Sequence, residues 1–151
     1  MIVYRLSRTK WANDLTGNGA RINGGRWNHP GTACMYTSES RALAVLEYTV
    51  NVTIHDIPRS LSIVTLEIPD DIADFPITSL PGDWAAAPAP SSTKDFGTAA
   101  LSVNVHPVLC FPSAIIPIEY NYVLNPLHPG SKNFKVLDVA DFIYDVRIKT
   151  V

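Results

Sequence analysis

The densest group of residues suited to binding a ligand lies in one glycine-rich segment of the 151-residue chain, Gly24-Gly25-Arg26-Trp27-Asn28. Adjacent glycines let the backbone approach a ligand closely and adopt positive φ angles. The arginine beside them carries a planar guanidinium that can bind a pyrophosphate through two parallel hydrogen bonds. The segment therefore indicates an anion site, and the alternative is a turn in which Arg26 is a solvated surface charge.

A second candidate for chemistry is Glu47, which lies within the apolar stripe of a predicted helix. Leu43, Leu46 and Val50 recur at helical spacing, and Glu47 falls at i+4 of the same stripe. Desolvation of a carboxylate costs several kcal/mol unless the group is paired or hydrogen-bonded. Glu47 is therefore either half of a structural ion pair or a group that takes part in chemistry, and both alternatives stay open at this point.

Short strands are predicted around both candidates, each bounded by glycine, proline or polar residues. They cover Ile2–Leu6, Ala33–Tyr36, Leu61–Ile68, Val108–Phe111, Ile118–Leu124 and Phe134–Val139. The five glycines of residues 12–31 predict a long loop, and the five prolines of residues 69–90 predict a second one with at most one helical turn.

Two helices are predicted between these strands. One is capped by Ser38 or Ser40 and carries Glu47. The other begins near Ser92, whose spacing to Asp95 resembles a capping box. Many short strands with two or three helices indicate a single mixed α+β domain.

The charge of the chain limits the class of ligand. The formal net charge is −2, which argues against nucleic acid as the main ligand. Residues 1–50 nevertheless hold six of the 12 Lys and Arg and only three of the 14 acids, so positive charge accompanies the glycine-rich segment. Charged residues make up 17% of the chain, against about 25% in a typical domain. This deficit suggests a surface covered by a partner, although a compact domain would look similar.

Neither the cysteines, the histidines nor the apolar pattern points to a disulfide, a metal or a membrane. Cys34 and Cys110 lie in apolar contexts typical of buried packing residues in a reducing compartment. The four histidines lack the spacing of a metal site. No run approaches the roughly 20 apolar residues of a membrane span, and the first residues lack the apolar segment of a signal peptide. We therefore expect a cytoplasmic protein.

The ordered set of motifs resembles the RES domain family over nearly the whole chain, residues 1–151. The set comprises Arg5, Gly17-x-Gly19-Ala20, the glycine-rich segment with Gly31, Tyr36-Thr37-Ser38-Glu39-Ser40 with Glu47, Phe111-Pro112-Ser113, Asn121-Tyr122-x-x-Asn125-Pro126 and Asp145-x-Arg147. The main departures are the proline-rich stretch around residues 81–90 and Phe111, where valine is common in the family.

This resemblance implies a fold similar to that of ADP-ribosyltransferases and an activity that consumes NAD as its substrate, without a further cofactor. Members of the family act as growth-arresting toxins, neutralised by a helix-turn-helix antitoxin of the Xre type encoded beside them. Because such antitoxins dimerise to bind DNA, a complex with at least two toxin chains is expected. Some relatives cleave NAD to nicotinamide and ADP-ribose or its phosphate adduct, and others transfer ADP-ribose to a protein. A non-catalytic binding module is the third alternative.

The residue chemistry agrees with an NAD-cleaving site. The bond to be broken joins a ribose carbon to a positively charged pyridinium, so nicotinamide leaves as a neutral molecule and needs no general acid. Glu47 is expected to stabilise the oxocarbenium-like transition state and to hold the ribose 2′-hydroxyl. Arg26, beside Gly25, would hold the pyrophosphate with help from Arg5.

Two further residues are candidates for contact with the substrate. Tyr36 would stack on the nicotinamide or contact the ribose, and Ser113 would hydrogen-bond the substrate. From pattern alone, Tyr36 is equally well a core residue at the end of a strand, and Ser113 is an ordinary turn residue after a proline.

Overall fold

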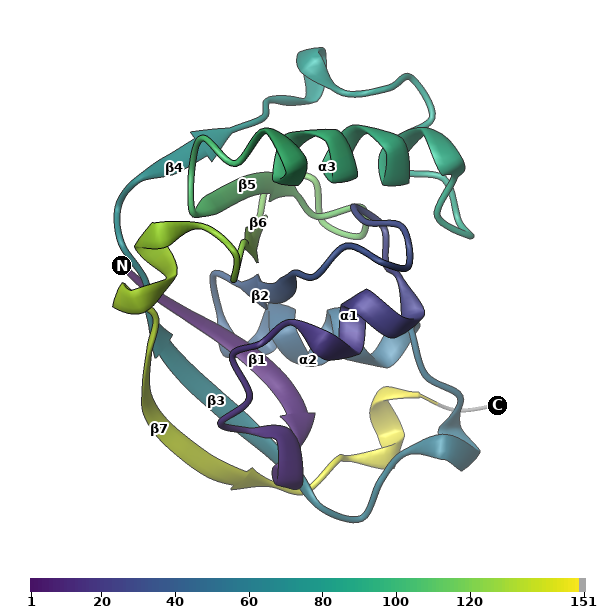
Figure 1. Ribbon diagram of the computed structural model, residues 1–151. Coiled ribbons are helices and arrows are strands. Elements are labelled where there is room, and N and C mark those ends of the chain that lie inside the picture. Colours follow the sequence, from purple (N-terminus) through teal and green to yellow (C-terminus); the bar gives the residue numbers. More distant parts are fainter. Residues whose placement is uncertain (150–151) are drawn as a thin grey trace.

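The computed structural model describes residues 1–149, which form a twisted seven-stranded sheet with three α-helices (Figure 1). The strands are β1 (Ile2–Arg8), β2 (Met35–Ser38), β3 (Leu61–Glu67), β4 (Ile72–Asp74), β5 (Val108–Pro112), β6 (Tyr120–Leu124) and β7 (Lys135–Phe142). The α-helices are α1 (Asn18–Asn23), α2 (Arg41–Val50) and α3 (Ser91–Val103). The strand order is β4-β5-β6-β2-β1-β3-β7, antiparallel except for the pair β4–β5. The predicted mixed α+β fold is confirmed.

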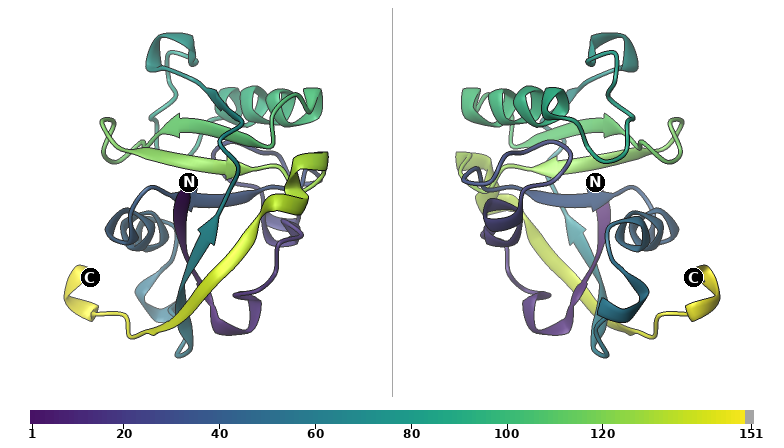
Figure 2. Two further views of the ribbon diagram at one scale, coloured as in Figure 1. Left: turned by 90° about the vertical axis from the view of Figure 1, so that its left-hand side faces the viewer. Right: turned by 90° about the vertical axis from the view of Figure 1, so that its right-hand side faces the viewer.

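The helices cover different parts of this sheet. α2 packs on β1 and β2, and α3 lies along β5, where its Phe96 ring contacts Phe111 of the strand (Figure 1). The turned views show a strong twist between the ends of the sheet, because β5 and β6 run across the view while β3 and β7 run obliquely (Figure 2). The chain between β1 and β2, which holds the glycine-rich segment, reaches α3 through Trp27.

Two apolar cores occupy opposite faces of the sheet. Val108 and Cys110 of β5 belong to the first cluster, whereas Leu109 and Phe111 belong to the second. This alternation follows from the two-residue period of a strand. In the second core, the Trp27 ring stacks on Phe111 with centroids 3.9 Å apart and an interplanar angle of 9°. The glycine-rich segment is thus anchored in the core by its tryptophan.

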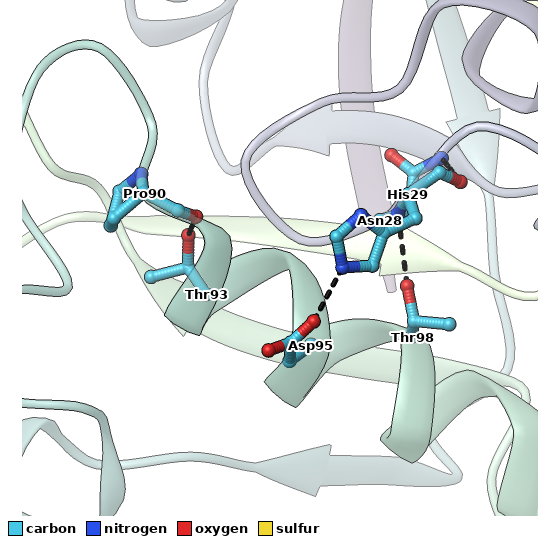
Figure 3. Close-up of polar contacts among 6 residues, drawn as sticks. All are labelled: Asn28, His29, Pro90, Thr93, Asp95 and Thr98. Atoms are coloured by element: carbon cyan, nitrogen blue, oxygen red, sulfur yellow. Dashed lines mark hydrogen bonds and ion pairs between the residues drawn. The ribbon is translucent and has the colours of Figure 1, made fainter.

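Helix α3 fixes the backbone of the glycine-rich segment. A Cβ atom at Gly97 would lie only 2.0 Å from the carbonyl oxygen of Trp27, so the helix and the segment are in direct backbone contact. Two side chains on one turn of α3 also contact His29, the residue that follows the segment (Figure 3). The His29 amide donates to Thr98 Oγ1 at 2.9 Å, and His29 Nε2 lies 2.5 Å from Asp95 Oδ1. These contacts hold the backbone on both sides of Asn28.

Replacement of Gly97 by alanine is expected to lower the free energy of unfolding by about 2 kcal/mol or more, because overpacking costs about 1–3 kcal/mol or more. Helix propensity alone would favour alanine by about 1 kcal/mol, so the sign of the effect tests the contact. Gly82→Ala is the matched control, since no atom lies within 4 Å of a Cβ there. Thermal unfolding of both variants checks this; a Gly97→Ala protein as stable as the parent contradicts the close contact.

The predicted strands are present with small shifts, and two short elements were missed. The strands β3 and β4 illustrate the difference between an element that was predicted and one that was missed. β3 matches the prediction for Leu61–Ile68, whereas the three-residue β4 lies in the predicted loop over residues 69–90. β4 depends on parallel pairing with β5, a contact distant in sequence. The six-residue α1 lies in the predicted loop over residues 12–31 and contains no buried residue, so it leaves no apolar periodicity to detect.

The predicted capping box of α3 is wrong. The helix begins at Ser91 after Pro90, and no side chain caps it. Ser92 Oγ donates instead to Asp83, while Asp95 pairs with His29. Both side chains of the apparent box therefore serve contacts between the helix and other segments. At α2, Ser40 is the capping residue, and its Oγ accepts a hydrogen bond from the Leu43 amide at 3.1 Å.

Both cysteines pack as predicted. Cys34, just before β2, and Cys110, in β5, are buried in the second and first cores, respectively, and neither is paired in a disulfide within residues 1–149. Burial raises the pKa of each thiol to about 12. Across the same residues, no helix combines the length and the apolar character needed to cross a membrane.

Candidate active site

A cavity of about 830 Å³ brings together most of the predicted site residues. Arg5, Gly25, Arg26, Tyr36 and Glu47 all line it. Its walls come from β1, α1, the glycine-rich segment, β2, α2, residues 85–89, the end of β5 with the residues after it, and β6. The cavity thus brings residues of positions 4–51 together with the proline-rich stretch and with residues 112–121.

Glu47 is held by neutral hydrogen-bond donors. Its Oε1 accepts a hydrogen bond from Ser113 Oγ at 2.7 Å and another from Asn121 Nδ2 at 2.6 Å. Within residues 1–149, Glu47 takes part in no ion pair, and no hydrogen bond ends on its Oε2. The structural ion pair considered from the sequence is therefore absent from the described residues, and one carboxylate oxygen stays available at the cavity.

The face that α2 buries differs from the one expected. Its buried residues are Leu43, Ala44 and Thr49, whereas Val50 is 54% exposed. Leu43 is therefore the one buried residue of the predicted stripe, and Glu47 is half-buried. In this half-buried position Glu47 lines the cavity while Leu43 of the same helix packs in the interior.

Ser113 supports Glu47 rather than lining the cavity. The residue follows β5 and is fully buried. Its Oγ accepts hydrogen bonds from the Ile115 amide at 3.1 Å and the Ile116 amide at 3.2 Å, so its proton is directed at Glu47. The structure thus gives Ser113 both the turn geometry expected after a proline and a contact with the carboxylate. Ser113 exposes no atom to the cavity, so this arrangement offers no group for the predicted hydrogen bond from Ser113 to the substrate.

Arg26 is tied to the proline-rich wall of the cavity. Its Nη1 donates to the carbonyl oxygens of Trp84 at 2.9 Å and Ala86 at 2.8 Å. Burial lowers the pKa of the guanidinium, and the nearby Glu47 carboxylate partly offsets that effect. Among the described residues no hydrogen bond engages Nε or Nη2. Arg26 is therefore not a freely solvated surface charge, and it keeps donors for a ligand.

Arg5 mainly secures the chain after β1. Its Nη2 donates to the carbonyl oxygens of Trp11, Ala12 and Asp14, at 3.3, 3.0 and 2.7 Å. Its Nε is buried without a hydrogen-bond partner in residues 1–149, and burial lowers the pKa of the guanidinium. Arg5 and Arg26 both line the cavity, and Glu47 is the one acidic residue among the described residues that line it.

The Tyr36 hydroxyl is engaged by the glycine-rich segment. It donates to Asn28 Oδ1 at 2.6 Å and accepts from the Trp27 amide at 3.0 Å. Burial raises the pKa of this hydroxyl well above its ordinary value. A Cβ atom at Gly25 would lie 2.6 Å from the hydroxyl oxygen, so only glycine leaves room for the ring there. The Tyr36 side chain packs against the second core, as the alternative of a core residue expects, and it also lines the cavity, so its contact with a substrate stays a prediction.

Two asparagines at the site were not predicted to have a role. Asn28 is fully buried, and its Nδ2 donates to the carbonyl oxygens of Ala20, His29 and Thr32. Asn121 contacts Glu47 from β6. Both belong to the motifs quoted from the sequence. The partners of Asn28 lie within eight residues of it, whereas Asn121 and Glu47 are 74 residues apart, so spacing alone gave no indication of the contact with Glu47.

The comparisons with known proteins agree on one family. The family model described as the RES domain matches residues 2–145. The chain is 38% identical over 146 residues to "Prs ADP-ribosylating toxin" of Sphingobium sp. (strain YBL2), which covers 94% of this chain and 91% of that protein. It is also 38% identical over 152 residues to "Toxin Res" of Photorhabdus laumondii, covering 98% of this chain and 97% of the relative.

A solved structure shares the fold. It is the toxin–antitoxin complex of MbcT and MbcA from M. tuberculosis, with a TM-score of 0.75 and 20% sequence identity. The similarity covers 93% of this chain and 83% of the matched chain. With the family match spanning nearly all of the sequence, the chain belongs to the RES domain family.

Proposed function

We propose that this chain is a RES toxin that binds NAD in the cavity and cleaves the bond between nicotinamide and ribose. The observation that carries the proposal is the Glu47 carboxylate, which has one oxygen held by Ser113 and Asn121 and the other without a hydrogen bond in the described residues. Arg26 and Arg5 lie on the walls of the same cavity. An anionic dinucleotide with a positively charged pyridinium matches this distribution of charge.

The chemistry needs one carboxylate. As nicotinamide leaves, positive charge moves onto the ribose ring, and an anionic oxygen placed beside it stabilises the transition state. Glu47 Oε2 is the oxygen we assign to this step and to the ribose 2′-hydroxyl. Arg26 holds the pyrophosphate with the donors that the wall leaves unused, and the Tyr36 ring supports the nicotinamide. A cavity of about 830 Å³ falls within the range of about 300–1,000 Å³ typical of ligand sites.

The acceptor of the ADP-ribosyl group distinguishes two versions of this activity. In the first, water or phosphate takes the group, and NAD is degraded. In the second, a protein takes it, which is favoured by the name of the Sphingobium relative, an ADP-ribosylating toxin. Release of nicotinamide from NAD without any protein acceptor supports the first version. A non-catalytic binding module is disfavoured because the carboxylate and both of its donors are in place.

We further propose a protein partner. The solved structure with this fold is described as a toxin–antitoxin complex. A helix-turn-helix antitoxin of the Xre type, dimeric on DNA, would bring at least two toxin chains into one assembly. The small share of charged residues, 17% of the chain, is consistent with a surface that such a partner covers.

The function is tested by expressing the chain with and without the neighbouring helix-turn-helix gene product. Expression of the chain alone is expected to arrest growth and deplete cellular NAD, and co-expression is expected to restore both. Purified protein incubated with NAD, with and without phosphate, identifies the product. Normal growth and unchanged NAD in cells that contain folded protein would contradict the proposal.

A further inference from the structure

A partly buried line of hydrogen bonds, whose three residues all line the cavity, connects β2, β6 and α2. Ser38 Oγ donates to Asn121 Oδ1 at 2.7 Å, and Asn121 Nδ2 donates to Glu47 Oε1 at 2.6 Å. Ser38 and Asn121 stand directly opposite each other in the β2–β6 pairing, and Ser38 is only 3% exposed. The line runs from Ser38, which is buried in the sheet, through Asn121 to the Glu47 carboxylate at the cavity.

The direction of each hydrogen bond is fixed. Because the Ser38 hydroxyl points at Asn121 Oδ1, the amide group of the asparagine turns its Nδ2 toward Glu47. The two acceptor contacts of Ser113, from the amides of residues 115 and 116, direct its hydroxyl proton to Glu47 in the same way. Glu47 therefore receives two donors whose orientation is set by groups behind them, and a carboxylate is the acceptor that matches them.

Both donors end on the same carboxylate oxygen. The bonds from Ser113 and Asn121 converge on Oε1, and no hydrogen bond in residues 1–149 ends on Oε2. Rotation of the carboxylate would break both bonds together, so its orientation is held. A carboxylate held in one orientation is already aligned with the reacting atoms when the substrate binds. Such alignment matters because a misplacement of about 1 Å can lower the rate about 100-fold.

We propose that Asn121, oriented by Ser38, is a positioning residue that aims Glu47 Oε2 at the reacting ribose. The proposal rests on the proposed function, since it assigns the orientation of the carboxylate in that same site. Asn121 acts through Glu47, and Ser38 acts through Asn121. The proposal therefore predicts an order of dependence among the three residues as well as a loss of activity.

Asn121→Ala is expected to lower kcat by about 10- to 100-fold with little change in KM, because the interaction with Oε2 strengthens only as charge develops on the ribose. Ser38→Ala is expected to lower kcat by about 3- to 10-fold, as the amide loses its orientation but not its donor. In the Asn121→Ala background, Ser38→Ala is expected to have no further effect. This non-additivity is the sign that Ser38 works through Asn121.

Two matched controls separate positioning from packing. Asn125 is a buried asparagine just after β6 whose amide donates to Leu101 and Asn104. Ser62 is a fully buried serine of β3 that is hydrogen-bonded to Thr9. Asn125→Ala and Ser62→Ala remove comparable groups away from Glu47, so they are expected to lower the thermal midpoint and leave kcat of the folded protein unchanged.

Steady-state NAD turnover of these variants, combined with a crystal structure of Asn121→Ala, tests the proposal. We expect the kcat losses above and a Glu47 carboxylate turned away from its native orientation. The proposal is overturned by a near-normal kcat in Asn121→Ala, by independent effects of the Ser38 and Asn121 changes, or by an unmoved carboxylate. If the parent protein does not consume NAD but the crystal structure shows the turned carboxylate, the proposed function fails and the orienting role of Asn121 stands.

Discussion

Replacement of Glu47 by glutamine is expected to lower the turnover of NAD by two orders of magnitude or more, about 2.7 kcal/mol in activation free energy, while the protein remains folded. Both hydrogen bonds to Glu47 end on Oε1, so the carbonyl oxygen of the glutamine can keep them. The new NH2 group then takes the place of Oε2 and offers the ribose a donor instead of a negative charge. Binding of NAD should weaken far less, because most of the electrostatic gain arises in the transition state.

The control for this change is Glu39→Gln. Glu39 is an exposed acid outside the cavity whose Oε1 accepts from the Tyr120 amide at 2.9 Å, so its replacement removes the same charge without touching the site. NAD turnover and thermal midpoint are measured on one preparation of each variant. A Glu47→Gln protein that turns over NAD normally but unfolds easily would mean that the carboxylate serves packing rather than chemistry.

Replacement of Arg26 by alanine is expected to reduce kcat/KM by 30-fold or more, equivalent to about 2–4 kcal/mol of lost transition-state binding. The variant loses both the charge and the planar fork of donors facing the pyrophosphate. It also leaves the carbonyl oxygens of Trp84 and Ala86 without their donor, which is expected to cost about 1 kcal/mol of stability. The loss of activity should therefore exceed the loss of stability.

Arg21→Ala is the matched control for Arg26. Arg21 is an exposed arginine of α1 whose guanidinium contacts Asn18, at 2.6 Å from Nη2. Its removal deletes the same charge nearby and should leave turnover within twofold of the parent, as judged by initial rates at several NAD concentrations. Equal activity of the parent and Arg26→Ala would show that Arg26 serves only to hold the wall.

The sequence predicted the strands well because their patterns are local. Val64 and Leu66, for example, alternate with polar residues in β3 and are both fully buried. The helix with Glu47 was also predictable, since Ser40 and the apolar spacing mark it. Its buried face was predicted less well, because which residues the helix buries depends on the surface of the sheet that it meets. That packing direction is a tertiary property and leaves no trace in the spacing.

The partners of the site residues were much less predictable than the residues themselves. Arg26, Tyr36 and Glu47 were identified from their types and from a family resemblance, and all three line the same cavity. The contacts of Ser113 and Asn121 with Glu47 join positions 66 and 74 residues apart in sequence. Such contacts follow from the order of the strands, which places β6 beside β2, and no local pattern specifies that order.

The way in which Arg26 is held bears on how this site can change. The groups that fix the guanidinium are backbone carbonyl oxygens, which every amino acid supplies. The cavity wall beside them presents only the small side chains of Ala85, Ala87, Pro88 and Ala89. Substitution along this stretch can therefore reshape the entrance while the anchor of the arginine persists. In evolution or in design, substitutions in the proline-rich wall can therefore change which substrates enter the site while Arg26 keeps its proposed contact with the pyrophosphate.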